Sequence, residues 1–262
     1  MLDQAFDASG VETAIDVASA SQVFRSSSGA RVAALHDVSL TVGPREFVSI
    51  VGPSGCGKST LLRIVAGLIA PTAGAVSVLG SSVGVRRRDV SLVFQRPALL
   101  PWLDILDNVL FPLRHMGRNV GAAERERALG LLSLMGIADF RAMRPNELSG
   151  GMQQRVAICR ALITDPRLLL MDEPFAALDA LTRDELGGEL LRLCALQPKA
   201  VLFITHSIAE AVTLSDRVLV MSPRPGHFRR DCPIPLPRPR DLGVTREPLF
   251  QELCSHVRDA IA

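Results

Sequence analysis

The chain has 262 residues, of which 48% are hydrophobic and 21% charged, so the composition favours a globular protein with a sizeable core and excludes global disorder. The formal net charge of +2 gives no reason to expect nucleic acid as a partner, and no run of about 18 apolar residues predicts a membrane span. The first residues lack the h-region of a signal peptide and the five cysteines show no CxxC spacing, so we expect a protein of the reducing cytoplasm without zinc or disulfides.

The first part of the chain predicts strands. Residues 13–24 and 36–51 alternate or run apolar with β-branched residues, and residues 26–31 between them predict a turn. Residues 74–80 and 90–94 predict two further strands, the second of them short and buried. The early strands are typical of antiparallel pairing and predict a β subdomain.

The rest of the chain alternates helical and strand patterns. Residues 97–144 contain helix-like segments interrupted by Pro and Gly, and residues 167–174, 200–206 and 217–222 predict buried strands. The proline-rich stretch 223–240 predicts an extended tail that is neither a central strand nor a helix interior. Strand–loop–helix units with long crossovers imply an α/β protein with a mostly parallel sheet.

Residues 52–60, GPSGCGKST, match the pattern G-x-x-x-x-G-K-[ST] between an apolar strand and a helical pattern. The glycines of such a loop let backbone N–H groups surround phosphate oxygens, and the Lys58 ammonium adds a charge near the β- and γ-phosphates. The Ser59 hydroxyl can ligate Mg²⁺. A generic glycine turn is the alternative, which this context disfavours, and Cys56 is expected to be a small filler. The predicted nucleotide-binding residues here are Gly52, Pro53, Ser54, Gly55, Cys56, Gly57, Lys58, Ser59 and Thr60.

Two carboxylates end the apolar run LLLMDE at residues 168–173. Buried carboxylates need a partner, and a metal ion is a suitable one. We therefore predict that Asp172 holds Mg²⁺, directly or through water, and that Glu173 lies near the γ-phosphate and polarises the attacking water. A strand end that merely exits into solvent is the alternative.

Gln95 and His206 each closely follow a predicted strand. Gln95 can reach the metal ion or the attacking water and so sense the γ-phosphate, although a glutamine there is by itself more often a surface residue. His206 is expected at the carboxyl edge of the sheet, where ligands of open α/β folds collect. It can hydrogen-bond the γ-phosphate, whereas a lone histidine is usually a packed or capping residue.

A second glycine-rich stretch, ELSGGMQQR at residues 147–155, cannot easily reach phosphates held by the first. It precedes a helical pattern. Ser149, Gly150 and Gly151 would offer a hydroxyl and backbone N–H groups at the amino terminus of that helix, which makes a second anion cradle.

Together these motifs resemble the ATP-binding subunit of an ATP-binding-cassette (ABC) transporter, over roughly residues 12–225. Residues 52–60 and 168–174 resemble its Walker A loop and Walker B strand, and residues 148–155 resemble its signature. Gln95 matches the Q-loop, Asp179 in AALDA the D-loop, and His206 the switch histidine. The resemblance implies that two such domains pair head to tail, so that the signature of one closes over the nucleotide held by the other.

Three positions depart from the usual pattern of the family. An aromatic residue often stacks on adenine, and because this chain has no tyrosine, Phe24 is the best candidate for nucleotide contact. Ser207 stands where an aspartate often follows the switch histidine, and Arg96 where an acid often follows the Q-loop glutamine. None of the three belongs to the predicted hydrolytic core.

The resemblance implies an α/β fold, namely a P-loop NTPase (RecA-like) core with an antiparallel β subdomain and an inserted helical subdomain. We expect one nucleotide-binding domain over residues 1–262. Residues 12–95 and 156–262 would form the ATP-binding core with the β subdomain, and residues 96–155 the helical subdomain that carries the signature.

Residues 97–109 and 218–226 resemble the nitrate, sulfonate and taurine branch of importer ATPases. In this family the first of these segments docks a cytoplasmic helix of the membrane subunit, and Trp102 lies within it. An ordinary core aromatic is the alternative for Trp102.

The implied function is hydrolysis of ATP to ADP and phosphate, with ATP and Mg²⁺, to power a multi-subunit importer of a small anionic solute such as nitrate, sulfonate or taurine. The implied partners are a second copy or a paralogous ATPase subunit, integral membrane permease subunits and, indirectly, an extracytoplasmic solute-binding protein, with no nucleic acid. The chain would lie peripherally on the cytoplasmic face of the membrane. One alternative is a soluble ABC-type ATPase that acts on nucleic acid or ribosomes; another is a P-loop kinase, which leaves LSGGMQQR unexplained.

Overall fold

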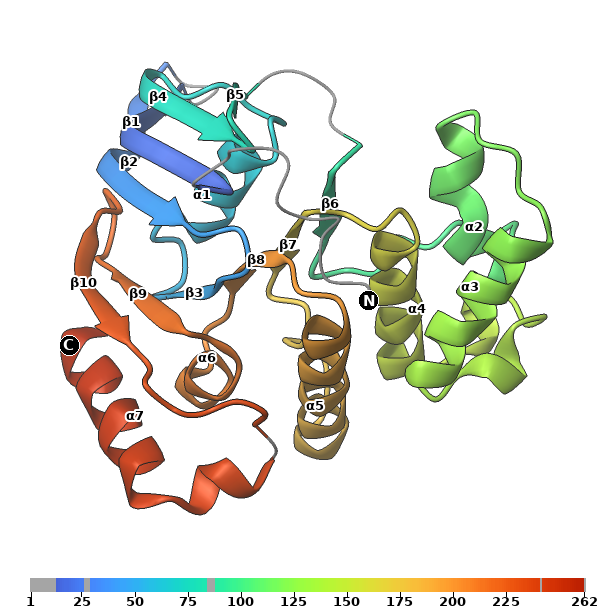
Figure 1. Cartoon of the computed structure of the whole chain (residues 1–262). Helices are drawn as coiled ribbons and strands as arrows, with labels where there is room; N and C mark the ends of the chain where they lie inside the picture. Colours follow the sequence, from blue (N-terminus) through green and yellow to red (C-terminus); the bar gives the residue numbers. More distant parts are fainter. Residues whose placement is uncertain (1–12, 26–28, 84–87, 241, 262) are drawn as a thin grey trace.

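The computed structural model describes residues 13–25, 29–83, 88–240 and 242–261, arranged around two β-sheets (Figure 1). The larger sheet has six strands in the order β10-β9-β3-β8-β7-β6, and the smaller has four in the order β2-β1-β4-β5. Figure 1 shows the smaller sheet above one end of the larger, with helices α2 and α3 set apart beyond the opposite end. The turn predicted at residues 26–31 lies partly outside the described residues.

Five strands of the larger sheet run parallel, and β10 pairs antiparallel at its edge. The parallel strands are near-continuous apolar runs because both faces of the sheet are covered. The six strands are β3 (Phe47–Val51), β6 (Val90–Val93), β7 (Leu168–Asp172), β8 (Ala200–Ile204), β9 (Arg217–Met221) and β10 (Phe228–Pro233).

Alternate residues of these strands enter different layers of the core. On β3, Val48 and Ile50 pack with the small sheet and with α1 (Lys58–Val65). Phe47, on the opposite face, packs with Phe203 of β8 and with residues of the helices that cover that face. The sheet is therefore a buried central layer, and its carboxyl edge is where the loops that follow β3, β7 and β8 emerge.

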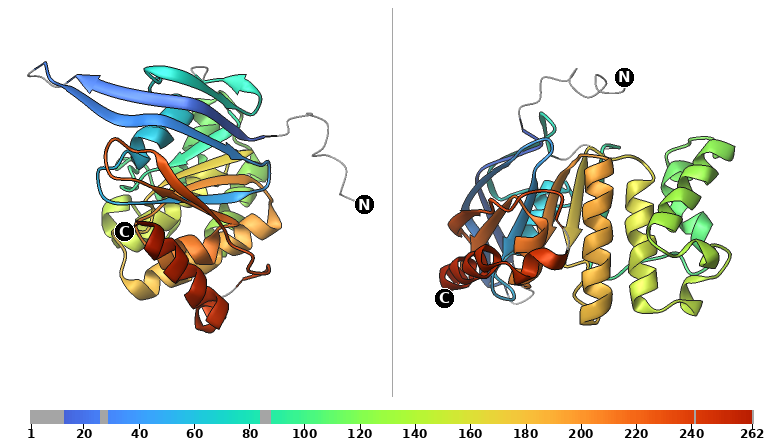
Figure 2. Two further views of the ribbon diagram at one scale, coloured as in Figure 1. Left: turned by 90° about the vertical axis from the view of Figure 1, so that its left-hand side faces the viewer. Right: turned by 60° about the horizontal axis from the view of Figure 1, so that its bottom comes forward.

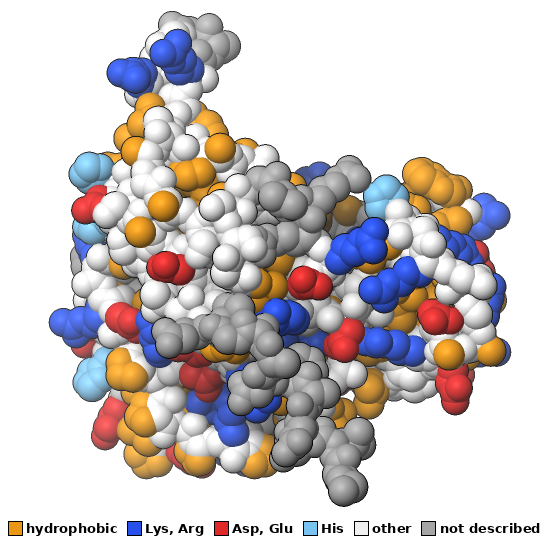
Figure 3. Space-filling view, turned by 45° about the horizontal axis from the view of Figure 1, so that its top comes forward, with side chains coloured by type: hydrophobic (Ala, Val, Ile, Leu, Met, Phe, Trp, Pro, Cys, Tyr) orange, Lys and Arg blue, Asp and Glu red, His pale blue; other side chains and the backbone are white. Residues whose placement is uncertain are grey.

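The small sheet is antiparallel, as predicted. Its strands β1 (Ile15–Arg25) and β2 (Arg31–Val42) form a long hairpin that projects from the surface (Figure 3). The strands β4 (Ala73–Val78) and β5 (Ser81–Ser82) complete this sheet.

The stretch 36–51, predicted as strand, is divided between the two sheets. β2 ends at Val42 and β3 begins at Phe47, and the Gly43 N–H donates to the Glu46 carboxylate at 2.8 Å in the turn between them. Pro44 lacks a backbone N–H, which suits a turn and not a continuing ladder. The turn moves the chain from the β subdomain into the central sheet.

Four helices lie on the opposite side of the central sheet from the small sheet. They are α2 (Ile105–His115), α3 (Ala122–Leu134), α4 (Gly150–Leu162) and α5 (Ala180–Leu196). Figure 2 shows α5 and α4 standing between the sheets and the outer pair α2 and α3. α4 is continuous through residues 155 and 156, so the subdomain boundary expected there falls inside this helix. None of the described helices is long and apolar enough to cross a membrane.

The carboxyl-terminal region contains more structure than the extended tail predicted from its prolines. β10 lies at the sheet edge, in agreement with the prediction that the tail is no central strand, and α7 (Pro248–Ile261) packs against β10 and against α6 (Ile208–Leu214). Phe250 and Val257 of α7 are buried against β9 and α6. In between, the buried Arg240 guanidinium donates to the carbonyls of Ser215 and Leu236, which holds the proline-rich segment to the core.

Candidate nucleotide-binding site

The loop between β3 and α1 folds around the side chain of Lys58, which is only 5% exposed. Its ammonium donates to the Gly52 carbonyl at 2.9 Å and to the Pro53 carbonyl at 3.1 Å. The charge is thus held in the loop by backbone oxygens, which phosphate oxygens can replace. Backbone carbonyls stabilise a buried ammonium less well than anionic oxygens do, so the site is electrostatically suited to phosphate.

Glycine is required in this loop because the backbone takes a conformation that a side chain would obstruct. Gly57 has φ +117°, and a Cβ there would lie 2.6 Å from Leu35 Cδ2 and 2.8 Å from the Ala34 carbonyl oxygen. These contacts come from β2, so the small sheet fixes the shape of the loop from one side. The fixed loop opens into the amino terminus of α1, where free N–H groups favour an anion.

Ser59 and Asp172 bring two oxygen ligands together. The Ser59 hydroxyl donates to Asp172 Oδ1 at 2.8 Å, and burial raises the pKa of the Asp172 carboxyl. Mg²⁺ is usually held by one or two protein oxygen groups together with phosphate oxygens and water, so a hydroxyl and a carboxylate placed together fit this ion. No three His, Cys, Asp or Glu side chains in the described part of the chain form a metal site. The remaining Mg²⁺ ligands would be phosphate oxygens, water and the predicted ligand Gln95.

Glu173 and His206 meet at the ends of the neighbouring strands β7 and β8. His206 Nδ1 lies 3.2 Å from Glu173 Oε2, and the Glu173 N–H donates to the Ile204 carbonyl at 3.0 Å. Glu173 has φ +45°, an unusual conformation for a residue with a side chain, and such strain clusters at functional sites. The carboxylate is consequently placed beside Asp172, the predicted metal ligand, where it could accept a proton from water.

The structure gives less support for the predicted roles of Gln95 and Phe24 than for those of the residues above. Gln95 is exposed two residues beyond β6, at the same edge of the sheet as Asp172 on the adjacent β7. Phe24 is 41% exposed near the tip of the β1–β2 hairpin. The Gln95 side chain makes no hydrogen bond among the described residues and Phe24 has no polar group, so their roles in nucleotide binding stay predictions.

The second glycine-rich stretch begins α4, as the predicted anion cradle requires. The Ser149 hydroxyl accepts from the Met152 N–H at 3.3 Å, and Ser149 and Gly150 are exposed. A Cβ at Gly151 would lie 2.8 Å from Thr182 Cγ2 on α5, and Asp179 caps that helix by accepting from the Thr182 N–H at 3.0 Å. Among the hydrogen bonds of the described residues, none joins residues 149–151 to residues 52–60. Within one chain the two cradles therefore lack a direct connection.

Sequence reasoning did not find what the last polar residues of this stretch do. The Arg155 guanidinium is nearly buried and donates to the Met135 carbonyl and to the carboxylates of Glu185 and Glu189 on α5. Gln154 Nε2 donates to the Phe94 carbonyl at 3.3 Å, next to Gln95. The polarity of this segment thus anchors α4 to α5 and to the loop that follows β6, and the only sequence signal is the presence of long polar side chains on a buried helix.

A chain of polar contacts also joins the loop before α5 to His206. Arg183 donates to the Leu178 carbonyl at 2.9 Å and lies 3.3 Å from the Glu210 carboxylate. The Thr205 hydroxyl donates to Glu210 at 2.6 Å, and Thr205 directly precedes His206. These residues, which the sequence analysis did not single out, hold the predicted D-loop and the switch histidine in one network.

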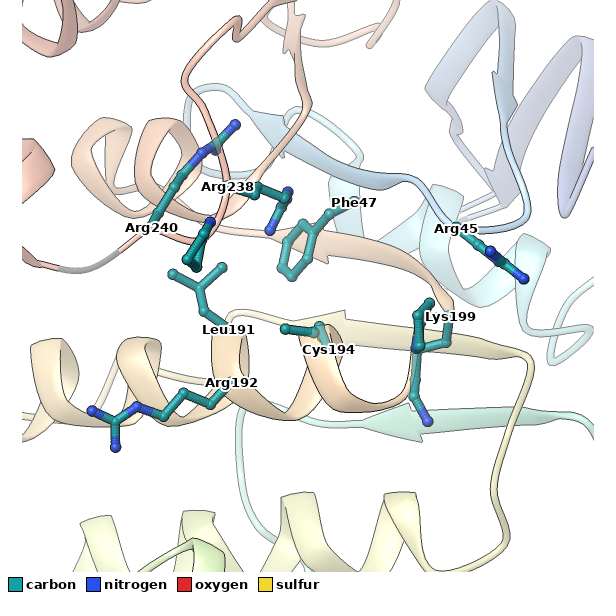
Figure 4. A pocket seen from close by; sticks show the side chains of 11 residues that line it. Arg45, Phe47, Leu191, Arg192, Cys194, Lys199, Arg238 and Arg240 are labelled. Carbon is teal, nitrogen blue, oxygen red and sulfur yellow. The ribbon is translucent and has the colours of Figure 1, made fainter. Parts of the chain in front are cut away.

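A cavity of about 270 Å³ lies at the opposite edge of the central sheet, near the amino-terminal ends of β3 and β8 (Figure 4). Phe47, Leu191 and Cys194 line it, and burial raises the pKa of the Cys194 thiol to about 11. Its basic residues include Arg238, which is paired with Asp216, and Figure 4 shows the Arg192 side chain pointing away from it. This cavity is separate from the phosphate-binding loop, which follows the carboxyl end of β3.

A parallel sheet with a glycine-rich phosphate loop after one strand and two carboxylates after another defines a P-loop nucleoside triphosphatase. The model of the ABC transporter family matches residues 35–176. A solved dimeric structure of the ATP-binding cassette MJ0796, in a post-hydrolysis state with ADP and Pi, superposes with a TM-score of 0.75 at 34% identity and covers 84% of this chain and 98% of that chain. The predicted fold class is thereby confirmed.

Two relatives show which importer ATPases this chain is similar to. The aliphatic sulfonates import ATP-binding protein SsuB 1 of Rhodococcus jostii is 51% identical over 219 residues, which cover 83% of this chain and 84% of the relative. The taurine import ATP-binding protein TauB of Ruegeria pomeroyi is 43% identical over 236 residues, which cover 89% and 87%. This chain belongs to the ABC transporter family, as an ATP-binding subunit with ATPase activity. The predicted resemblance to sulfonate and taurine import ATPases is confirmed. No finding favours the nucleic-acid alternative.

Proposed function

We propose that the chain hydrolyses ATP as one of two identical subunits that power import of a small sulfonate-type anion. The observation that carries the catalytic part is the grouping of Ser59, Asp172, Glu173 and His206 at the carboxyl ends of β7 and β8 and the start of α1. The names of the relatives, which are sulfonate and taurine import proteins, support the solute class.

In the proposed reaction the phosphate-binding loop holds the triphosphate, and Lys58 exchanges its backbone acceptors for phosphate oxygens. Ser59 and Asp172 would hold Mg²⁺, which neutralises phosphate charge. Glu173 orients the attacking water and accepts its proton, while His206 positions the Glu173 carboxylate and donates to the γ-phosphate. Water forms a bond to the γ-phosphorus as the bond to the β–γ bridging oxygen breaks, which yields ADP and phosphate.

The exposed cradle at Ser149–Gly151 supports a head-to-tail dimer. Its open N–H groups can bind an anion, and the phosphates of a partner subunit's nucleotide would supply one. MJ0796 was solved as a dimer, which supports such an arrangement. The two sites would then close together when ATP binds and separate after hydrolysis.

We further propose that the segment around Trp102 docks a permease subunit at the cytoplasmic face of a membrane, where an extracytoplasmic binding protein would deliver the solute. Trp102 is 68% exposed in the turn before α2, and Phe94 and Phe111 are also exposed. That exposure removes the alternative of an ordinary core aromatic. Trp102→Ala should leave ATPase activity intact and uncouple transport in reconstituted vesicles; unimpaired transport would contradict this assignment.

Glu173→Gln tests the catalytic assignment. The amide keeps the size and the hydrogen-bonding reach of the side chain but cannot accept a proton, so we expect phosphate release to fall by about 100-fold or more. The affinity for ATP, measured by equilibrium titration of both proteins, should stay near that of the wild type. Phosphate release near the wild-type rate would exclude Glu173 as the general base.

A further inference from the structure

The turn between β9 and β10, residues 222–227, contacts the phosphate-binding loop from outside. Arg224 donates to the Gly55 carbonyl twice, from Nε at 3.1 Å and from Nη2 at 2.9 Å. Bonds from a charged donor are stronger than neutral ones, and a fork on one oxygen fixes the direction of that carbonyl. The nucleotide-binding motifs do not include this turn, and it lies about 170 residues further along the chain.

The direction of the Gly55 carbonyl determines where the next amide points. Among the described residues the only cis peptides precede Pro225 and Pro239, so the Gly55–Cys56 peptide is trans. In a trans peptide the C=O and the following N–H point in opposite directions. With its carbonyl held outward by Arg224, this peptide turns the Cys56 N–H into the loop, where its acceptor is the Pro53 carbonyl at 3.4 Å. That distance is long for an N–H···O bond, so the donor can readily move to a phosphate oxygen.

A second, independent contact fixes the same turn against the loop and against β2. The Gly226 N–H donates to the Ala34 carbonyl at 2.9 Å, and the His36 N–H donates to the Gly226 carbonyl at 3.0 Å. A Cβ at Gly226 would lie 2.1 Å from the Cys56 carbonyl oxygen, so the turn approaches the loop as closely as backbone allows. The turn therefore connects β2, β9 and the phosphate-binding loop.

We propose that Arg224 is a positioning residue, which holds the phosphate-binding loop in its anion-binding conformation before the nucleotide arrives. It acts through the Gly55–Cys56 peptide and touches no reacting atom. N–H donors that already point into the loop raise its affinity for phosphate, because the loop loses little conformational entropy when the nucleotide binds. The inference rests on the proposed function only in that the loop must bind a nucleotide with two or more phosphates.

The test is a calorimetric titration of ATP and of ADP into the full chain carrying Arg224→Ala or Arg224→Lys. Loss of a charged fork should raise the dissociation constant by about tenfold for both nucleotides, because both carry phosphates that this loop surrounds. Lysine keeps one charged donor but not the fork, so it should recover part of the affinity. Arg230→Ala is the matched control, because this exposed arginine lies on the adjacent β10 and makes no described hydrogen bond to residues 52–60.

The thermal midpoint of each nucleotide-free variant separates positioning from general stability. The proposal requires weaker binding in Arg224→Ala at an unchanged midpoint, with partial recovery in Arg224→Lys. Unchanged affinity in Arg224→Ala overturns it, and so does an affinity loss that follows a lowered midpoint and is not recovered by lysine. If the wild type itself bound neither nucleotide, the proposed function would fail before this comparison began.

Discussion

The two glycine-rich loops are built in opposite ways. The loop at residues 52–60 is enclosed by its own chain, with Lys58 buried, Gly57 pressed against β2 and Gly55 held by Arg224. The loop at residues 147–151 is held from behind, where the Gln153 side chain donates to the carbonyls of Pro145 and Leu148 and Gly151 lies close to Thr182 of α5. Its front is open, and a Cβ at Gly150 would meet nothing within 4 Å.

The difference indicates where each loop finds its anion. A loop whose shape is fixed by strands and turns of one chain can bind phosphate as a monomer, since its donors are already ordered. A helix amino terminus that is firmly held but uncovered has its donors in solvent, so an anion carried by a second subunit can reach them. We infer that the first loop binds the nucleotide and the second completes the site of a partner subunit.

The largest expected effect comes from the first loop. Lys58→Ala removes the closest cation from the triphosphate, so we expect the dissociation constant for ATP to rise by about 100-fold, equivalent to about 2.7 kcal/mol. Lys199→Ala removes the only other lysine, which lies at the opposite edge of the sheet, and should leave ATP affinity unchanged. Equal affinities for ATP in Lys58→Ala and the wild type, by equilibrium titration, would contradict the monomer-binding role of the first loop.

Opposite effects on stability should follow when a methyl group is added to each loop. Gly57→Ala combines a strained φ with a clash against Leu35 and should lower the free energy of unfolding by about 2–3 kcal/mol. Gly150→Ala places alanine in open space in the first turn of α4 and should raise that free energy by about 0.5 kcal/mol. Urea unfolding of the nucleotide-free chains measures both. If Gly150→Ala proved the more destabilising, the second loop would not be open as described.

The sequence predicts the residues that would contact nucleotide or metal better than it predicts the residues that hold them in position. The residues that bear the chemistry follow short patterns, and Ser59, Asp172, Glu173 and His206 meet because parallel strands bring their carboxyl ends to one edge of a sheet. Arg224 could not be predicted in the same way, because its contact with Gly55 depends on how β9 lies beside β3. No local pattern encodes that neighbourhood.

The carboxyl-terminal region shows the same limit. Prolines at residues 233–239 correctly predict an extended segment, yet α7 follows them, with Phe250 and Val257 as its buried face. The 3.6-residue period of an amphipathic helix of this length predicts the helix from the sequence. The neighbours that the helix packs against depend on the position of β10 at the edge of the sheet. Local patterns therefore predict the elements, whereas long-range packing decides which elements stabilise the site.

Complementation between two defective chains tests the central claim most directly. Both chains carry Glu173→Gln to prevent turnover; one adds Lys58→Ala, and the other adds Ser149→Arg, which blocks the open cradle with a bulky cation. Alone, at an ATP concentration well below the raised dissociation constant of Lys58→Ala, the first should stay empty and the second should bind ATP as a monomer, so neither should form a dimer on a sizing column. Mixed with ATP, they should form a heterodimer, because the intact first loop of one chain can be covered by the intact second loop of the other. If the mixture stayed monomeric while Glu173→Gln alone dimerised, or if the Ser149→Arg chain dimerised by itself, the assignment of the second loop to a partner's nucleotide would be wrong.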